Sequence, residues 1–186
     1  MTDAFCRDLN RGSNSVTRKL PGLRKLISRL ESRVPQPQDG LPEPIFLFIS
    51  RLTPLLSVDL LIRDNNGRTL LTWRDDDSYG PGWHVPGGIV RYRESLADRV
   101  REVARLELRA RVEFEATPLS IVEAIRSNVK NRAHTISMLF RCRLLTQPNK
   151  ALRLHQRAPT PGCWQWHSTC PKNLIPEQRS YEPFLR

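Results

Sequence analysis

The spacing of apolar positions changes along this chain, and each change predicts a different element. In residues 21–34 the apolar side chains recur every three or four positions, as on one face of a helix: Leu23, Leu26, Ile27, Leu30 and Val34. The proline-rich run PQPQDGLPEP then breaks the pattern. The sequence therefore predicts a short helix in an N-terminal extension.

From residue 45 onward the pattern is typical of strands. Apolar runs predict strands over residues 55–64, 68–75, 120–127, 134–145 and 163–168, and Asn65-Asn66-Gly67 predicts a hairpin turn between the first two. A long helix is expected over residues 94–109, and the chain end predicts a short closing helix. This order indicates an α+β fold. We divide the chain into a basic N-terminal extension with a short helix (1–40), a main domain (41–172) and a C-terminal tail (173–186).

One carboxylate of the predicted central helix lies on its apolar face. Four residues follow one another at i, i+4, i+7 and i+11: Leu96, Val100, Val103 and Glu107. A carboxylate among core residues is costly unless it is paired or hydrogen-bonded. Glu107 therefore lies at an exposed helix end, forms a salt bridge to one of the many arginines, or is a metal ligand. The metal would lie beneath the Pro86-Gly87-Gly88 turn, where glycines let backbone carbonyls approach an ion.

The charge of the chain is strongly positive but dispersed. The 186 residues carry 30 Lys and Arg against 19 Asp and Glu, a formal net charge of +11. There is no single basic block and no interleaving of aromatic and basic residues of the kind that stacks nucleobases. Nucleic acid is therefore a candidate partner that the pattern does not favour over a phosphorylated small molecule.

The remaining composition bounds the cellular setting. The apolar run FLFISRLTPLL is interrupted by Arg51, and the first residues lack the apolar segment of a secretory signal, so we expect a cytoplasmic protein without a membrane span. Cys163, His167 and Cys170 lack a fourth zinc ligand, which favours structural thiols. The extension helix mixes both charge signs on its polar face, so we expect it to pack on the domain or pair in a homodimer.

The segment GWHVPGGIVRYRESLADRVREVARLELRARV, residues 82–112, resembles the signature of the Nudix hydrolases, G-x5-E-x7-R-E-U-x-E-E-x-G-U with U apolar. Gly88, Glu94 and Glu107 match it, whereas Glu102-Val103, Leu106 and Arg109 depart from it. The resemblance implies a Nudix-type α/β/α sandwich with a mixed β-sheet over residues 46–170 and a divalent-metal site that cleaves diphosphates. The lost carboxylates disfavour a multi-metal site that attacks phosphorus.

The run TPLLSVDLLIRDNNGRTLLTWR with GWHVPGG is similar to the GDP-mannose mannosyl hydrolases. Those enzymes lack part of the ordinary signature, use one Mg²⁺ and substitute at the sugar carbon. The resemblance implies that the Gly87 carbonyl, Glu107 and Gln156 hold Mg²⁺ and that Phe46, Asp59 and Arg74 bind substrate. It also implies a base, with His155 preferred and His134 in reserve.

The role of the later histidine-glutamine pair stays open. The Gln-His pair of the family is reversed here as His155-Gln156, so His155 is either the base or itself a metal ligand, or the loop stays on the surface. We expect Glu94 to anchor the loop at the helix start rather than to perform chemistry.

The expected function is a Mg²⁺-dependent hydrolase of a nucleoside diphosphate sugar. The alternative is a Nudix-fold protein of weak activity that binds a nucleotide or nucleic acid as a regulator, and the lost carboxylates and basic surface favour this alternative.

Overall fold

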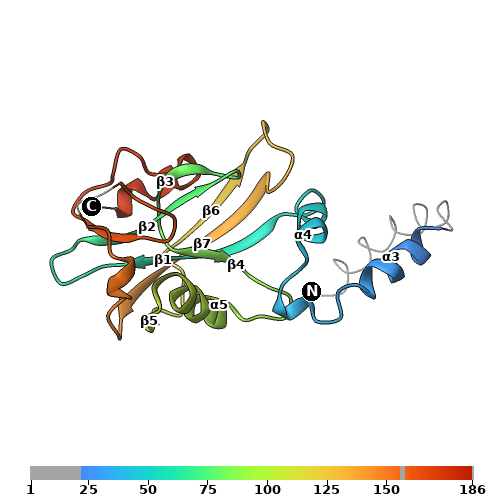
Figure 1. Ribbon diagram of the computed structural model, residues 1–186, viewed down its shortest axis with the longest axis horizontal. Helices are drawn as coiled ribbons and strands as arrows, with labels where there is room; N and C mark the ends of the chain where they lie inside the picture. The colour runs from blue at the N-terminus through green and yellow to red at the C-terminus, as the bar shows by residue number, and fades with distance from the viewer. Residues whose placement is uncertain (1–21, 156–157, 186) are drawn as a thin grey trace, which may run out of the picture. The chain divides into compact units, whose positions relative to one another are not determined.

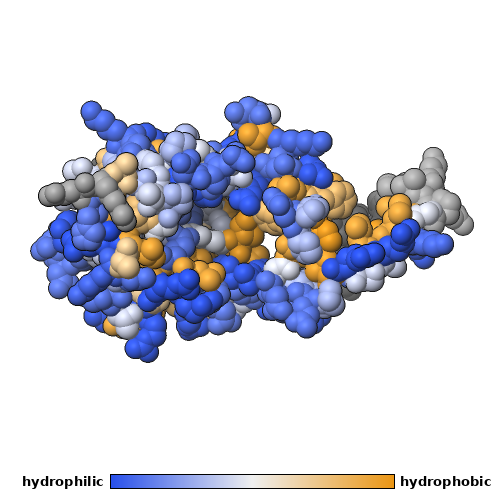
Figure 2. All heavy atoms as spheres, in the orientation of Figure 1, coloured by the Kyte–Doolittle hydropathy of each residue, from blue (hydrophilic) through white to orange (hydrophobic). Residues whose placement is uncertain are grey.

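The computed structural model of the protein describes residues 22–155 and 158–185. The chain divides into two compact units, Met1–Pro42 and Glu43–Arg186. In the first unit, helix α3 (Leu23–Glu31) is followed by the short 3-10 helix η2 (Pro37–Asp39). Apolar side chains of α3 reach the surface (Figure 2), with Leu26 57% exposed, so pairing with a second subunit stays a prediction. Pro21 lies outside the described residues.

The larger sheet of the second unit is mixed. It contains β1 (Leu55–Ile62), β4 (Gly87–Ile89), β5 (Val112–Phe114), β6 (Ser120–Ile125) and β7 (His134–Leu144), in the order β4-β1-β7-β5 with β6 also paired to β7. β1 and β7 run parallel, and the other pairs are antiparallel (Figure 1). The predicted α+β architecture around a mixed sheet is confirmed.

The smaller sheet contains β2 (Thr69–Asp76), β3 (Gly80–His84) and β8 (Trp164–His167), in the order β3-β2-β8. The predicted turn before β2 is present, with the Gly67 amide donating to the Asp64 carbonyl at 3.0 Å. The predicted hairpin itself is wrong, because β1 and β2 meet at the bridge Arg63–Thr69 and then enter different sheets. Both strands are apolar on both faces, so each needs cover on two sides.

The central helical segment covers the larger sheet. The predicted central helix is shorter than residues 94–109: α5 (Leu96–Val103) continues into one π-helical turn, η3 (Ala104–Leu108). It begins at 96 because the Ser95 side chain caps it by accepting from the Asp98 amide. α5 packs against the larger sheet through Val100 and Val103 (Figure 1). A further helix, α4 (Glu43–Ile49), was not predicted.

The end of the chain is part of the second unit. The predicted closing helix is the 3-10 helix η5 (Pro176–Phe184), and another short one, η4 (Lys150–Leu152), precedes β8. Backbone hydrogen bonds of 2.9 Å join Trp83 to Asn173 and to Ile175, so the tail extends the edge of β3. Tyr181, 1% exposed, belongs to the core between the sheets. No helix among the described residues is long and apolar enough to span a membrane.

Candidate functional site

The Pro86-Gly87-Gly88 turn links β3 to β4 and lies at the centre of the site. Gly87 pairs with Asp59 of β1 in the antiparallel register. A Cβ atom on Gly87 would come within 2.0 Å of Asp59 Oδ1, so the carboxylate can lie against the turn because residue 87 is a glycine. The Gly87 amide donates to Glu107 Oε1 at 3.1 Å. Gly87 therefore binds the carboxyl group of Glu107 from η3 and lies directly against that of Asp59 from β1.

Glu107 comes from the π-helical turn that ends the central helix. Such turns re-aim side chains and are frequent at functional sites. Its Oε2 accepts a hydrogen bond of 3.0 Å from the Thr72 hydroxyl of β2. Burial raises the pKa of Glu107 to about 7, the hydrogen bonds and the charge of Arg74 oppose this, and the nearby Asp59 carboxylate adds to it. The carboxyl group is therefore easily protonated unless a cation is present.

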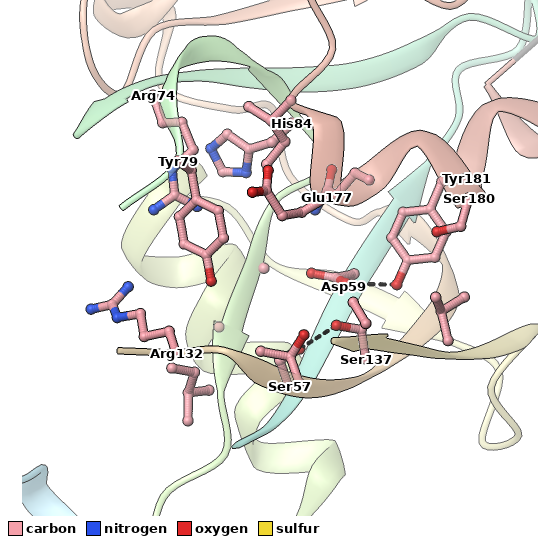
Figure 3. Close-up of a pocket in the computed structure, with 18 residues that line it drawn as sticks. Ser57, Asp59, Arg74, Tyr79, His84, Arg132, Ser137, Glu177, Ser180 and Tyr181 are labelled. Atoms are coloured by element: carbon pink, nitrogen blue, oxygen red, sulfur yellow. Dashed lines mark hydrogen bonds between the residues drawn. The ribbon is translucent and has the colours of Figure 1, made fainter. Parts of the chain in front are cut away.

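Asp59 is the second acid at the turn and is 6% exposed. The Tyr181 hydroxyl donates to its Oδ2 at 2.7 Å (Figure 3). Burial raises the pKa of Asp59 to about 7 against the opposing effect of Tyr181, Ser137 and Arg74. The pKa of Tyr181 is raised in turn by burial and by the Asp59 carboxylate, so the phenol remains the donor. The C-terminal tail thus fixes an acid on the central strand.

His84 was missed by the sequence reasoning, although it stands two residues before the Pro-Gly-Gly turn. Its Nδ1 lies 2.9 Å from the Val85 carbonyl, which can only accept, so Nδ1 carries the proton. Burial lowers the pKa of His84 to about 4, so the ring is neutral and Nε2 accepts. Nε2 lies 3.0 Å from the Thr72 hydroxyl, which has one proton to give. When Glu107 is protonated, Glu107, Thr72 and His84 form an ordered donor–acceptor chain.

Two pockets meet at this centre and share Arg74, His84 and Gly87. The Asp59 pocket, about 250 Å³, is rich in hydroxyl groups and includes Ser57, Asp59, Tyr79, Ser137, Ser180 and Tyr181 (Figure 3). The Glu107 pocket, about 430 Å³, includes Thr72, Asp75, Leu106, Glu107, Arg109 and Gly162. A ligand with a charged middle and two different ends fits such a pair of pockets.

Arg74 lies at the junction of the two pockets, near the end of β2. Its Nε donates to Asp76 Oδ2 at 2.7 Å, and its guanidinium stacks 4.3 Å from the centre of the Tyr79 ring. The guanidinium of Arg126 lies 4.7 Å from the same ring centre. The charge of Arg74 lowers the pKa of both carboxyl groups and of His84. Arg74 therefore influences the charge state of all three titratable groups at the turn: Asp59, Glu107 and His84.

The structure brings together five of the residues singled out from the sequence: Asp59, Arg74, Gly87, Gly88 and Glu107. Phe46 of α4 lines neither pocket, but its ring centre is 4.9 Å from the guanidinium of Arg132, which lines the Asp59 pocket. Glu94 accepts from the Arg91 amide at 2.9 Å and from Arg99 at 2.8 Å, outside both pockets. These contacts tie the loop to α5.

The other predicted residues lie away from the pockets or outside the described residues. Glu102 points outward and pairs with Arg105 at 2.7 Å. Side chains alternate along β7, so Thr135 and Ser137 line the Asp59 pocket while His134 faces the opposite side and meets Glu123 at 2.9 Å. This geometry does not support His134 as a reserve base. His155 is exposed and lines neither pocket, and Gln156 lies outside the described residues.

A metal ion has few protein ligands to choose from here. Across the described residues, no group of three His, Cys, Asp or Glu side chains is arranged to hold one. The Glu107 carboxylate and the carbonyl groups of the glycine turn remain as oxygen donors. Mg²⁺ fits this set, because it is commonly bound by one or two carboxylates, waters and the phosphates of a substrate.

Comparison with known proteins identifies the architecture. No family model matches the chain. A MutT NUDIX hydrolase from Burkholderia pseudomallei superposes with a TM-score of 0.58 at 21% identity, covering 72% of this chain and 99% of that one. A MutT protein from Methanosarcina mazei gives 0.54 at 22% identity, covering 71% and 94%. The chain has the Nudix hydrolase fold.

One curated protein has a higher sequence identity over a shorter stretch of the chain. The low-salt glycan biosynthesis protein Agl8 of Haloferax volcanii is 37% identical over 81 residues, which make up 44% of this chain. The match spans 51% of Agl8, so the chain is similar to about half of that protein's length.

Within the Nudix fold, the structure places each of the altered signature positions. Val103, 2% exposed, stands where the signature has a glutamate and packs under Gly88, where a Cβ would meet its Cγ2 at 2.8 Å. Leu106 replaces another carboxylate and lines the Glu107 pocket. Arg109 replaces the closing glycine in a left-handed conformation, φ 53°. This Nudix fold therefore keeps Glu107 as the acid of its helix that reaches the pockets.

Proposed function

We propose that this Nudix-fold protein is a Mg²⁺-dependent hydrolase of a nucleoside diphosphate sugar of the GDP-mannose kind. The observation that carries the proposal is the position of Gly87 between Asp59 and Glu107, with Arg74 at the junction of two pockets. A diphosphate at this junction would lie beside Arg74, with the sugar in the hydroxyl-rich Asp59 pocket.

Glu107 and the Gly87 carbonyl would hold the ion, with Gln156 as a further proposed ligand. The bound Mg²⁺ would neutralise the charge of the leaving diphosphate. Glu107 must lose its proton to bind a cation, and its pKa of about 7 places that loss in the neutral range. Thr72 and His84 orient the carboxyl group from the other side.

The substrate class follows from the pocket linings. A planar guanidinium such as that of Arg74 can bond two phosphate oxygens at once. The hydroxyl groups and the Asp59 carboxyl of the Asp59 pocket match the donors and acceptors of a sugar. The name of the Haloferax volcanii relative, a glycan biosynthesis protein, agrees with a sugar-containing substrate.

Attack at the sugar carbon agrees with the depleted helix. Val103 and Leu106 supply no carboxylates, so the helix lacks the acids with which several metal ions would activate water at phosphorus. We propose His155 as the base. It shortly precedes Pro161 and Gly162 in the sequence, and these two residues line the Glu107 pocket.

The test is turnover of a panel of nucleotide sugars in water that carries a heavy oxygen isotope, with and without Mg²⁺. We expect Mg²⁺-dependent release of a nucleoside diphosphate, with the isotope in the sugar. Glu107→Gln serves as the inactive control, and Glu102→Gln as the control that stays active, because Glu102 points away from the pockets. Label in the phosphate would refute attack at carbon, and no turnover of any sugar would refute the hydrolase.

The second candidate is a binding protein that uses the same fold without turnover, favoured by the missing carboxylates and the charge of +11. It predicts measurable nucleotide affinity with no hydrolysis. Binding of RNA or DNA with a steep salt dependence would assign nucleic acid as its ligand.

A further inference from the structure

Arg109 stands at a position that favours glycine. It follows η3 and adopts a left-handed backbone conformation, φ 53° and ψ 37°. A side chain in this region crowds the following carbonyl, so an arginine here costs free energy that a glycine would not. Such an outlier is a reason to look for a function of the side chain.

Arg109 lines the Glu107 pocket together with Arg74. Within residues 22–155 and 158–185, the Arg109 guanidinium has no hydrogen bond or ion pair, whereas Arg74 pairs with Asp76 and Arg105 pairs with Glu102. The pocket also contains Asp75. A ligand must therefore compete with Asp76 for Arg74, whereas Arg109 offers a guanidinium that forms no ion pair with any described residue.

The loss of acids and the gain of a cation occur on the same helical segment. Val103 and Leu106 stand at two carboxylate positions of the Nudix signature. Arg109 stands three residues after Leu106 and lines the same pocket as Glu107. Carboxylates serve a phosphate site by holding cations. A guanidinium can contact phosphate oxygens directly and needs no metal to do so.

We propose that the Glu107 pocket is a phosphate-binding subsite in which Arg109, together with Arg74, supplies positive charge. In a protein with the full signature, additional metal ions bound by the carboxylates would supply this charge. The ligand class is the phosphate of a nucleoside diphosphate or of inorganic pyrophosphate. This inference deepens the proposed function and rests on its placement of the diphosphate, but binding without metal tests it separately from turnover.

The test is the affinity of the full chain for inorganic pyrophosphate, GDP and guanosine, measured by titration calorimetry in EDTA and again in Mg²⁺. Arg109→Gly and Arg109→Ala should weaken pyrophosphate and GDP binding about tenfold in both buffers and leave guanosine unaffected. Arg109→Lys should fall between these variants and the wild type. Arg111→Ala, which removes a neighbouring exposed arginine outside both pockets, is the matched control and should retain affinity.

A melting curve separates the proposed role from a structural one. Arg109→Gly relieves the left-handed strain, so its melting temperature should rise while its phosphate affinity falls. Affinity unchanged in Arg109→Gly, an equal loss in Arg111→Ala, or no pyrophosphate or GDP binding by the wild type would each overturn the subsite. If the wild type hydrolyses no nucleotide sugar but Arg109→Gly still weakens phosphate binding, the subsite is supported and the proposed hydrolase activity is refuted.

A double variant tests the exchange of acids for a cation. Leu106→Glu with Arg109→Gly restores two signature positions, and Leu106 is 41% exposed and tolerates a polar side chain. Its pyrophosphate affinity should drop in EDTA and recover in Mg²⁺ more than that of Arg109→Gly alone. Equal recovery in the two variants would contradict the exchange.

Discussion

The Tyr181 hydroxyl donates a 2.7 Å hydrogen bond to Asp59 Oδ2 across 122 residues of sequence. The bond links the end of the chain to the strand at the centre of the larger sheet. On the same 3-10 helix, Gln178 Oε1 accepts from the Val85 amide at 2.6 Å, directly before the glycine turn. The C-terminal tail therefore contacts both Asp59 and the residue before the glycine turn, and its residues act by positioning them.

Tyr181→Phe removes the hydroxyl and keeps the ring in the core. We expect a loss of about 1–3 kcal/mol in the free energy of unfolding, because a buried carboxyl loses its donor. The pKa of Asp59 should rise further, since Tyr181 lowers it. Urea unfolding and the pH profile of activity measure the two effects. Tyr92→Phe, at an exposed tyrosine, is the control. A pH profile of Tyr181→Phe that matches the wild type would argue against the link between Tyr181 and Asp59.

Gly87→Ala tests the close approach of Asp59 to the turn. The added Cβ would lie 2.0 Å from Asp59 Oδ1, so the turn must shift or the carboxylate must leave. We expect destabilisation of about 1–3 kcal/mol, as for overpacked cores, together with loss of activity. The double variant with Asp59→Ala should recover stability in thermal melts without recovering activity. Gly22→Ala, where a Cβ meets nothing within 4 Å, should be neutral. Equal stability of Gly87→Ala and wild type would exclude the predicted clash.

Much of this arrangement could be predicted from local sequence. The apolar runs, the turn glycines and the stripe that places Glu107 among core positions depend on near neighbours and on periodicity. The two-sheet division was missed, because the Asn65-Asn66-Gly67 turn is typical of a hairpin and does not reveal that β1 and β2 each need two covered faces.

The contribution of the tail could not be predicted in this way. Gln178 and Tyr181 reach the site through contacts that cross most of the chain, and no local pattern in residues 173–186 points to Asp59 or Val85. His84 had a local signal, its place before the turn, but its burial and its contact with Thr72 depend on β2. The orientation of His134 follows from strand alternation once Thr135 and Ser137 are placed on the pocket side.

The pH dependence of stability should report the two acids of the site, Asp59 and Glu107. Burial raises the pKa values of Asp59 and Glu107 to about 7 from ordinary values of 3.8 and 4.5. A carboxyl whose pKa rises on folding stabilises the fold while protonated, so this contribution is full below about pH 4 and is lost as the pH rises through 7. Asp59→Asn and Glu107→Gln should each flatten the decline in chemical unfolding between pH 4 and 8, and the exposed Asp77→Asn should not. Wild-type slopes in the first two variants would contradict the shifted pKa values.

Arg74→Ala should show that one guanidinium both binds phosphate and sets the charge state of the acids. We expect GDP affinity to fall about tenfold or more, the loss of a charge-assisted contact, with Arg74→Lys intermediate because an ammonium lacks the planar fork. The charge of Arg74 lowers the pKa of Asp59 and Glu107, so the pH at which Mg²⁺ binds half-maximally should rise in Arg74→Ala. Calorimetry across pH measures both quantities, with the exposed Arg141→Ala as the control. If the pH dependence shifts but GDP affinity does not fall, Arg74 influences the pKa values of the acids but does not contact the diphosphate.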